Sequence, residues 1–541
     1  MSVVQEPDTG RVIVIGAGPV GQTGALLLAR WGIPVTVLDA RPERDLVGSK
    51  SICQQRDVLD VWEAVGAGRQ IADEGVTWER ARTYYRDKEL FCLTFAERGR
   101  SAFPPFVNIS QSRTEEILDE RIAATPSIEV RWAHEVIGIA QDDDGVTVTC
   151  RTPDGERTLR APYVLACAGA KGDAVRDMLG LEFAGRSFDD HFLICDIRAD
   201  LGAWANERRF YFDPEWNPGR QVLIHPCPDS TYRIDWQVPA DFDLDEQHRS
   251  GALDRRIRQI VGDRPYEVVW SSVYRFHARL VDRMRVGRVL VAGDCAHLVA
   301  PFGARGLNSG VQDVENAAWK LAFVLRGWAS PELLESYTIE RRAAAAENIA
   351  VTSSTMDFLV PQSEAAWQRR RDVLERALTD PGARAEVDSG RLAEPFWYVD
   401  SPLTTPHPTR VFTGRPPRGQ APPVVPGVLV PDAPITVAGS PHVNRLREIA
   451  RDGVLVLTTG DPTVAETAAT AVTRAPVRAL AVADIDPSGL LAEALDARPG
   501  EAFVVRPDGH LAAVVAPDDA SALSAAVARL LGRPAASGQP A

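Results

Sequence analysis

A glycine-rich segment near the start of the chain constrains the fold more than any other feature of the sequence. The β-branched run from Arg11 to Ile15 leads into Gly16-Ala17-Gly18-Pro19-Val20-Gly21, and a helical stretch from Thr23 to Trp31 follows. A second apolar run, from Val35 to Leu38, ends on Asp39. This order of strand, glycines, helix, strand and acidic residue predicts a dinucleotide-binding βαβ unit, and we expect no separate domain before it.

Each conspicuous residue of this unit has its own physical role. Gly16 allows the tight turn, Gly18 lets a pyrophosphate approach the backbone, and Gly21 permits close packing of the helix on the strand. Asp39 is placed to accept hydrogen bonds from the ribose of an adenosine group. We therefore predict that Gly16, Gly18, Gly21 and Asp39 bind the adenine half of a dinucleotide.

A second informative segment, GDCAHLVAPFGARGLNSGVQD, covers residues 293–313 and follows the apolar run Val289 to Val291. Asp294 lies on the turn after that strand, where its carboxylate can reach the hydroxyls of a polyol. Small residues precede a helical pattern from Val311 to Arg326, so that backbone N–H groups and the positive end of a helix can meet a flat anionic ring. A reduced flavin has such a ring. Taken alone, the segment would also fit an ordinary strand–turn–helix unit.

The two segments together account for both ends of one FAD molecule. On these motifs the chain resembles the group A FAD-dependent aromatic hydroxylases of the p-hydroxybenzoate hydroxylase superfamily. The resemblance is strongest to the branch of phenol, hydroxyphenylpropionate and polyketide hydroxylases, and it covers residues 11–400 strongly and the remainder weakly. It implies an α/β fold, with a Rossmann-like FAD-binding domain, an inserted β-sheet substrate domain and a C-terminal thioredoxin-like domain.

The resemblance also implies roles at the ring end of the cofactor. Asp294 would hold the ribityl chain, and Pro301 would line the catalytic face of the flavin ring. The backbone at Leu307-Asn308, next to Gly306, would meet the pyrimidine edge of the ring.

Three further residues match positions that contact the cofactor in the family. Gln111, in the segment from Asn108 to Arg113, matches a glutamine that touches the cofactor. Arg41 and Arg56 occupy positions where the family often has arginines in contact with phosphate, although both would equally fit a solvated surface.

One motif departs from the family pattern, which has Asp-Gly followed by Ala-Arg-Ser-x-x-Arg and serves both FAD and NAD(P)H. After the strand from Tyr163 to Cys167, this chain has Ala168 in place of the aspartate and one additional residue before Val175-Arg176. Asp173 is the nearest carboxylate that could compensate. We expect FAD binding to survive through the other anchors, whereas the use of the pyridine nucleotide stays open. Cys295 is interpreted as a small buried side chain and not as a redox thiol.

The pattern along the chain predicts several domains. Alternating strands, such as Arg209 to Phe212 and Tyr232 to Val238, indicate the substrate sheet, and a proline-rich stretch separates a final α/β region that has no cysteine. Within that region, the turn from Arg506 to His510 should link two strands and leave His510 on the surface. The expected ranges are 1–76, 107–187 and 279–398 for the FAD-binding domain, 77–106 and 188–278 for the substrate domain, 399–426 for the linker, and 427–541 for the thioredoxin-like domain.

The composition narrows the classes of function. The 541 residues are too many for one core, and a net charge of −14 argues against nucleic acid or an anionic membrane as a partner. No apolar run approaches the ~20 residues that a membrane helix needs, and the first ten residues lack the pattern of a secretory signal. The seven cysteines are scattered without metal-binding spacing. We expect a reduced, cytoplasmic protein without a metal site, and the resemblance implies a homodimer or a higher homo-oligomer.

The resemblance implies hydroxylation of a phenolic or other electron-rich ring, with O2 and with NADPH or NADH, through a flavin C4a-hydroperoxide. Such chemistry needs a dry pocket lined by aromatic residues. Our candidates for substrate contacts are Tyr211, His225, Trp236 and Phe302. His225 is also the candidate base, although a histidine on such a strand is more often structural. Arg233 lies on a strand of the same region, but the sequence does not single out an arginine for a substrate carboxylate.

Three alternatives were weighed. A flavin-dependent halogenase is discounted, because none of the twelve tryptophans lies two residues from another, as its Trp-x-Trp motif requires. Hydroxylation of a heteroaromatic ring of the pyridinol type is compatible with every motif. A non-catalytic flavin-binding protein is the alternative from another class, and Ala168 is the feature that favours it.

Overall fold

The glycine-rich N-terminal segment follows β2, a central strand of a six-stranded sheet, in this computed structural model, which describes residues 4–5, 10–45, 51–94, 101–416 and 420–533. The sheet has the order β19-β20-β13-β2-β3-β9, and only the pair β19–β20 is antiparallel. Its strands are β2 (Val12–Ile15), β3 (Val35–Leu38), β9 (Ile128–Arg131), β13 (Val164–Ala166), β19 (Arg285–Val286) and β20 (Val289–Val291). The predicted βαβ unit is therefore present. The predictions for residues 95–100, 417–419 and 534–541 lie outside the described residues.

Helices cover this sheet, and two of them begin earlier than predicted. Helix α1 (Pro19–Arg30) starts at a proline, which suits the first turn of a helix because that position needs no N–H partner. Helix α8 (Gly306–Leu325) starts five residues before the predicted Val311. The glycines of this segment have weak helix propensity, but Asn308 hydrogen-bonds the backbone of Cys53 and Gln55 and so holds the first turn of α8 in place.

This part of the chain contains further strands and helices outside the six-stranded sheet. A four-stranded sheet contains the predicted hairpin, whose register pairs Gln141 with Val146. The strands outside the main sheet are β1 (Val4–Gln5), β4 (Cys53–Gln55), β5 (Val76–Thr77), β8 (Phe106–Asn108), β10 (Glu135–Gln141), β11 (Val146–Thr152) and β12 (Gly155–Ala161). The helices are α2 (Arg56–Glu63), α3 (Gly68–Glu74), α4 (Gln111–Ala123), α5 (Asp173–Met178), α9 (Glu335–Leu359), α10 (Glu364–Ala377) and α11 (Pro381–Arg384).

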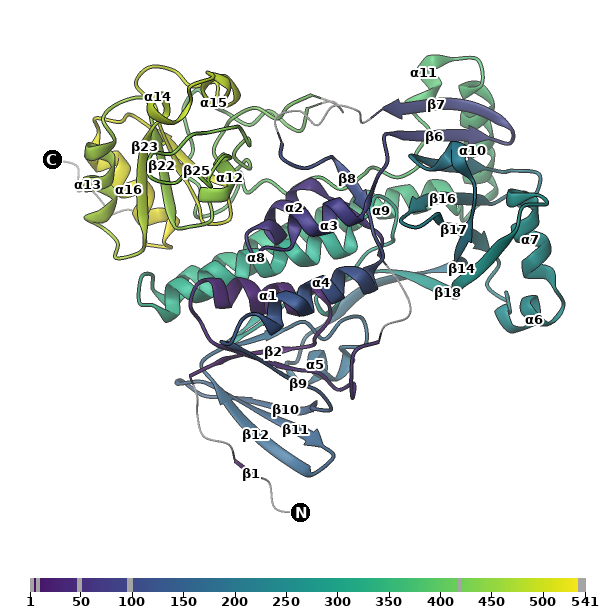
Figure 1. Cartoon of the computed structure of the whole chain (residues 1–541), viewed down its shortest axis with the longest axis horizontal. Helices are drawn as coiled ribbons and strands as arrows, with labels where there is room; N and C mark the ends of the chain where they lie inside the picture. The colour runs from purple at the N-terminus through teal and green to yellow at the C-terminus, as the bar shows by residue number, and fades with distance from the viewer. Residues whose placement is uncertain (1–3, 6–9, 46–50, 95–100, 417–419, 534–541) are drawn as a thin grey trace.

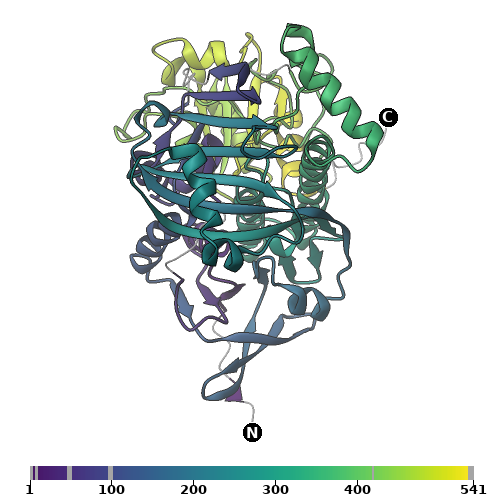
Figure 2. The same cartoon turned by 90° about the vertical axis from the view of Figure 1, so that its right-hand side faces the viewer.

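An eight-stranded sheet lies next to the first domain, in the order β21-β18-β14-β17-β16-β15-β6-β7 (Figures 1 and 2). Residues 80–94 join it through a parallel pairing of β6 with β15, although they precede the other strands by more than 80 residues. Helices α6 (Leu244–Arg249) and α7 (Ala252–Val261) belong to the same region. The strands are β6 (Arg80–Tyr85), β7 (Lys88–Thr94), β14 (Phe183–Ala199), β15 (Glu207–Phe212), β16 (Gln221–Cys227), β17 (Thr231–Val238), β18 (Tyr266–Val281) and β21 (His297–Leu298).

The C-terminal region forms a separate four-stranded sheet with the order β23-β22-β24-β25, in which only β22 and β23 are parallel. Its thioredoxin-like assignment stays a prediction. The described part of residues 399–426 contains no helix or strand, as the prolines predict. The elements are β22 (Val454–Thr458), β23 (Val477–Ala481), β24 (Ala502–Val505), β25 (Leu511–Val515), α12 (Leu446–Ile449), α13 (Pro462–Thr470), α14 (Val482–Ile485), α15 (Leu490–Ala494) and α16 (Ala520–Leu530).

A buried cluster of charged side chains joins the C-terminal domain to α8 and α9. Arg506 donates to Glu340 of α9 at 2.6 and 2.9 Å and to Asp508 at 2.6 Å. Lys320 of α8 also donates to Glu340 at 2.6 Å, and burial lowers its pKa to about 8 against the opposing effect of Glu340. The prediction that His510 is on the surface is wrong, because this side chain is 7% exposed and packs on Tyr398. The turn between β24 and β25 is thus part of the domain interface.

No helix within the described ranges has the length and apolar character to span a bilayer. All seven cysteines, each of which is described, have free thiols, and burial raises the pKa of Cys295 to about 11, in keeping with its interpretation as a small buried side chain.

Arg506→Met should destabilise the protein, because it leaves Glu340 and Asp508 buried without their guanidinium partner. We expect a loss of about 3–5 kcal/mol, as for other broken buried ion pairs. Arg498→Met is the matched control, since Arg498 pairs with Asp496 on the surface of the same domain, and it should change the stability by less than about 1 kcal/mol. Equal urea midpoints for the two variants would contradict the importance of the buried cluster.

Candidate functional site

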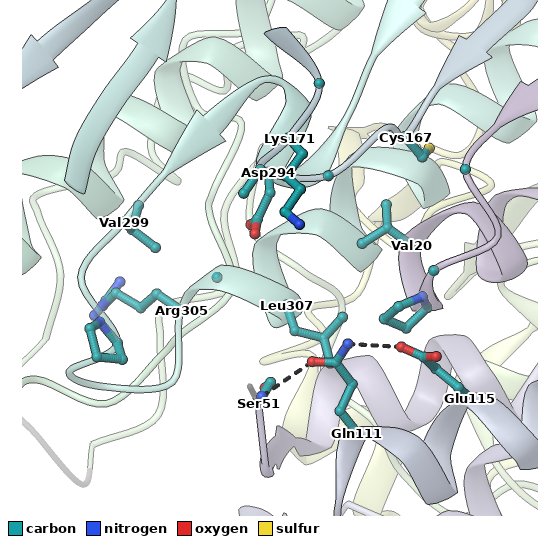
Figure 3. Close-up of a pocket in the computed structure, with 18 of the residues that line it drawn as sticks. Val20, Ser51, Gln111, Glu115, Cys167, Lys171, Asp294, Val299, Arg305 and Leu307 are labelled. Atoms are coloured by element: carbon teal, nitrogen blue, oxygen red, sulfur yellow. Dashed lines mark hydrogen bonds between the residues drawn. The ribbon is translucent and has the colours of Figure 1, made fainter. Parts of the chain in front are cut away.

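One continuous cavity of about 720 Å³ runs from the carboxyl edge of the parallel sheet to the eight-stranded sheet (Figure 3). Parallel α/β sheets bind ligands at this edge, where loops and helix N-termini meet. The cavity is lined by predicted site residues from both glycine-rich segments and from the chain after them: Gly16, Gly18, Asp39, Arg41, Gln111, Asp294, Pro301, Phe302, Gly306 and Leu307, together with His225 from the eight-stranded sheet.

The three glycines of the first segment differ in the space around them. Gly16 has a φ of +104°, and a Cβ there would lie 2.3 Å from the carbonyl oxygen of Cys167. A Cβ on Gly21 would lie 1.9 Å from the carbonyl oxygen of Gly16. A Cβ on Gly18 would have no protein atom within 4 Å, because this residue borders the cavity. Two glycines therefore permit close packing, while Gly18 leaves the backbone at the N-terminus of α1 open to an anionic group.

Asp39 lies at the end of β3 with its carboxylate held in place. The Ala17 N–H donates to it at 2.7 Å, and Arg41 donates to both of its oxygens at 2.9 Å. Burial alone would raise the pKa of Asp39, but the hydrogen bonds from Arg41 and Ala17 hold it below its ordinary value. Asp39 is thus an ionised acceptor at the cavity wall, and Arg41 lies beside it with its guanidinium 5.5 Å from the centre of the Trp132 ring.

Gln111 is the first residue of α4, and Figure 3 shows it facing the cavity. Its Oε1 accepts from the Ser51 N–H at 3.2 Å, and its Nε2 donates to Glu115 at 2.8 Å. These two bonds fix the orientation of the amide, so that it presents a defined edge to a bound molecule.

The ring end of the cavity is formed by the turn at Gly293-Asp294 and by the first turn of α8. Asp294 and Leu307 face the cavity from these two elements (Figure 3). Gly306 is the first residue of α8, so that free N–H groups of the helix N-terminus lie at the cavity wall. Asn308 is 2% exposed and does not line the cavity, since its side chain binds the backbone around β4.

Asp313 of α8 supports this end of the cavity and was not identified from the sequence. Its carboxylate accepts from the Gly293 N–H at 3.0 Å, contacts His297 Nε2 at 2.7 Å and accepts from Arg341 at 2.7 Å. Burial would raise its pKa, but the charges of His297 and Arg341 keep it below the ordinary value. The helical period around Asp313 places it on the buried face of α8, and an acidic residue on such a face was the available signal.

The segment that departs from the family motif also lines the cavity. Ala168 and Lys171 belong to the wall, but Asp173 points away and pairs with Arg176 at 2.5 Å. Arg176 in turn donates to the carbonyl oxygen of Cys295 at 3.2 Å. Asp173 therefore does not replace the missing carboxylate. Arg56 does not line the cavity either.

Two predicted substrate contacts lie on the wrong face of the sheet. Tyr211 and Trp236 both pair with Val222, so that all three side chains share one face, and Trp236 is fully buried against Ile257 of α7. Tyr211 stacks on Tyr84 at 4.6 Å. Side chains alternate along a strand, and the face that contains His225 is the one that borders the cavity.

The cavity face of this sheet instead combines apolar and charged residues. Its members are Phe192, Ile194, Arg208, Leu223, His225, Arg233, Asp235 and Phe276. Arg233 donates two hydrogen bonds to Asp196, each at 2.8 Å. Burial, together with Arg208 and Arg233, places the pKa of His225 well below its ordinary value. The described residues contain no group of three or more histidine, cysteine or acidic side chains that could hold a metal ion.

Comparisons with known proteins agree with this geometry. A family model described as an FAD binding domain matches residues 9–352, and a model described as the C-terminal part of aromatic-ring hydroxylases matches residues 424–534. A 3-(3-hydroxy-phenyl)propionate/3-hydroxycinnamic acid hydroxylase from Comamonas testosteroni is 32% identical over 374 residues, which are 68% of this chain and 62% of that protein. A 6-methylpretetramide 4-monooxygenase from Streptomyces rimosus is 29% identical over 530 residues, which are 94% of this chain and 91% of that protein.

Solved structures show the same fold. The flavin-dependent monooxygenase PieE, solved with FAD and substrate, matches 98% of this chain and 100% of its own, with a TM-score of 0.82 and 22% identity. Aklavinone-11 hydroxylase, solved with FAD and aklavinone, has the same coverage, a TM-score of 0.77 and 24% identity.

Gly306→Val tests the ring end of the cavity. The added side chain would enter the cavity, where the closest atom to its Cβ is Val299 Cγ2 at 3.7 Å, so the fold should tolerate it. We expect normal expression and an unchanged unfolding temperature, but little or no FAD after purification. Gly202→Val, at the exposed first residue of a short 3-10 helix, is the control that should keep the cofactor. Full FAD content in Gly306→Val would contradict the placement of the flavin ring at α8.

Proposed function

Because the chain belongs to the FAD-dependent aromatic hydroxylases, we propose that it is a monooxygenase that hydroxylates a phenolic or other electron-rich ring with O2 and NADPH or NADH. The continuity of the cavity is the observation that carries this proposal. One space joins an anion site at the N-terminus of α1, a polyol-binding carboxylate at Asp294 and an aromatic face at Phe302. FAD has a matching sequence of parts, namely a pyrophosphate, a ribityl chain and a flat ring.

The fit to FAD rests on this chain's own atoms. Gly18 leaves space for the pyrophosphate at the N-terminus of α1, and Asp39 offers an ionised acceptor to the ribose. Asp294 would hold the ribityl hydroxyls, and the amides of Gly306 and Leu307 would bind the pyrimidine edge. Arg41 completes the adenine end of the proposed site, and Gln111 would also contact the cofactor.

The bound flavin, once reduced by the pyridine nucleotide, would activate O2 for transfer of one oxygen atom to the ring. The protein has to exclude water, hold the ring and favour its electron-rich form. Pro301 and Phe302 would cover the ring, and Phe302 packs on Phe192 and Phe276 at 5.5 and 6.3 Å between ring centres. His225 would contact the substrate as a neutral hydrogen-bonding group, because its low pKa makes it a weak proton acceptor.

The names of the relatives support an aromatic substrate. They include a hydroxyphenylpropionate hydroxylase and a para-nitrophenol 4-monooxygenase from a Pseudomonas strain. A heteroaromatic substrate of the pyridinol type remains the second candidate within this class. The other class, a non-catalytic flavin-binding protein, is favoured by one observation: Ala168 replaces the motif aspartate, and Asp173 points away from the cavity. We propose a homodimer or higher homo-oligomer, on the family resemblance alone.

An anaerobic titration distinguishes the monooxygenase proposal from the alternative of a non-catalytic flavin-binding protein. Purified protein should be yellow, and NADPH or NADH should bleach its flavin absorbance in the presence of a suitable phenol. Re-aeration should then give a product that has gained one oxygen atom, as measured by mass spectrometry. A yellow protein that neither nucleotide bleaches with any phenol or pyridinol in a screen would favour the non-catalytic alternative.

Asp294→Ala should lose FAD during purification, because the ribityl chain would lose its carboxylate partner. We expect a fall in FAD content of at least about tenfold, which corresponds to about 1.4 kcal/mol of binding free energy. Asp177→Ala, which removes an exposed carboxylate from α5, is the control and should retain FAD. Cofactor content would be measured from the flavin absorbance released on denaturation. Retention of FAD by Asp294→Ala would count against this role.

A further inference from the structure

Asp235 lies in the middle of β17 and faces the cavity, although nothing in the sequence marked it as a site residue. Its Oδ1 is buried and has no hydrogen-bond partner among the described residues. A carboxylate oxygen in this position costs stability unless something binds it. Because the described residues leave Oδ1 without a partner, we expect a molecule in the cavity to bind it.

The strand register defines the surroundings of this carboxylate. Asp235 is directly opposite Leu223 of β16 and Ile194 of β14, so its nearest cross-strand neighbours are apolar. Phe192 and Phe276 line the same wall. A ring that packed against these residues would be kept from water, and a hydroxyl on that ring could reach Asp235.

Within the part of the chain that the structure describes, the charged groups that face Asp235 lie one row further along the sheet. They are Arg233 on its own strand, His225 on β16, Arg208 on β15 and Asp196 on β14. Asp196 holds the guanidinium of Arg233 through two hydrogen bonds. His225 is neutral, because burial and the two arginines lower its pKa. Asp196 is bonded to Arg233 and His225 is a weak base, so of these groups Asp235 is the one that can best accept a proton from a ligand.

We propose that Asp235 takes the proton of a ring hydroxyl on the substrate, and that the cavity therefore selects aromatic rings with a free hydroxyl group. The inference rests on the proposed hydroxylase function and names its substrate class. In this step the substrate O–H bond breaks and a new O–H bond forms on the Asp235 carboxylate. The electron pair stays on the ring oxygen, which makes the ring more nucleophilic. The proton returns to solvent when the product leaves.

The charge state of Asp235 suits this role. Burial raises its pKa to about 7, with Asp196 acting in the same direction and with Arg233 and Arg208 opposing. A general acid or base works best when its pKa is close to the operating pH. Near neutrality the carboxylate can therefore both accept a proton and release it.

Asp235→Asn is the test variant, since asparagine keeps the shape and the hydrogen-bonding capacity but cannot take the proton. Asp241→Asn is the matched control, because Asp241 is an exposed carboxylate just after the same strand. Both would be purified as holoenzymes and compared for FAD content, which should equal that of the unaltered protein. The probes are 3-(3-hydroxyphenyl)propionate and its methyl ether, 3-(3-methoxyphenyl)propionate.

The first readout is the affinity for each of the two probes. It would be measured through the change that binding causes in the flavin spectrum, at several pH values from about 6 to about 8.5. The unaltered protein and Asp241→Asn should prefer the hydroxyl compound at least about tenfold, and the preference should grow as the pH rises through about 7. In Asp235→Asn the preference should shrink, and its dependence on pH in this range should disappear. The rate of product formation should show the same break near pH 7 and lose it in Asp235→Asn.

The second readout separates a functional role from a structural one. The raised pKa means that the unfolded chain ionises more easily than the folded protein, so the ionised carboxylate destabilises the fold increasingly as the pH rises from about 4 to about 7. Asp235→Asn should consequently have a higher unfolding temperature than the unaltered protein at about pH 8, and Asp241→Asn should not. A purely structural carboxylate would give the opposite result.

The outcomes distinguish the two proposals. A colourless protein, or a yellow one that forms no oxygenated product from any phenol, would overturn the hydroxylase function itself. A yellow, active protein in which Asp235→Asn keeps the preference and the pH dependence would overturn only the role of Asp235. Equal affinity of the unaltered protein for the hydroxyl and methoxy probes, or absence of binding of both, would also overturn that role.

Discussion

The buried carboxylate of Asp313 is the interaction on which the site depends. It binds the Gly293 N–H, His297 and Arg341, and so ties the turn after β20 to helices α8 and α9. Arg341 also donates to Tyr398, which packs on His510 of the C-terminal domain. Because an unpaired charge would be costly in this interior, the three partners lock the turn in one position. Asp294 and the N-terminus of α8 consequently face the cavity at fixed positions, before any ligand binds.

The same helices give the C-terminal domain a structural role. It has no cysteine, yet its β24–β25 turn enters a cluster of charges with Glu340 and Lys320, on the same helices that Asp313 connects. The domain thus stabilises α8 and α9 through contacts of Asp508 with Asn316 and Trp319 and of Arg506 with Glu340. The substrate sheet forms the other boundary, and its mixture of aromatic residues with a few ionisable groups is typical of sites that orient a small aromatic molecule.

Local patterns predicted the βαβ unit, the strands of the eight-stranded sheet and most cavity-lining residues of the two glycine-rich segments, because these depend on residue periodicity and on the positions of glycines. Contacts between distant segments could not be predicted in this way. Tyr211 and Trp236 were placed in the cleft because they are aromatic, but only the register with Val222 shows which face they occupy. His510 lies on a turn that would be solvated in an isolated domain, but it is buried against Tyr398 and close to the Phe396 carbonyl oxygen, more than 100 residues earlier in the chain. Asp235 is notable only once its neighbours are known to be Leu223 and Ile194.

The most direct test of the account is a crystal structure of the purified yellow protein. Density for a single FAD should run through the cavity, with the adenosine ribose at Asp39, the pyrophosphate at Gly18 and the flavin ring against the first turn of α8. FAD bound elsewhere, or in the reverse direction, would contradict the central claim that the βαβ unit and the turn at Asp294 grip the two ends of one cofactor.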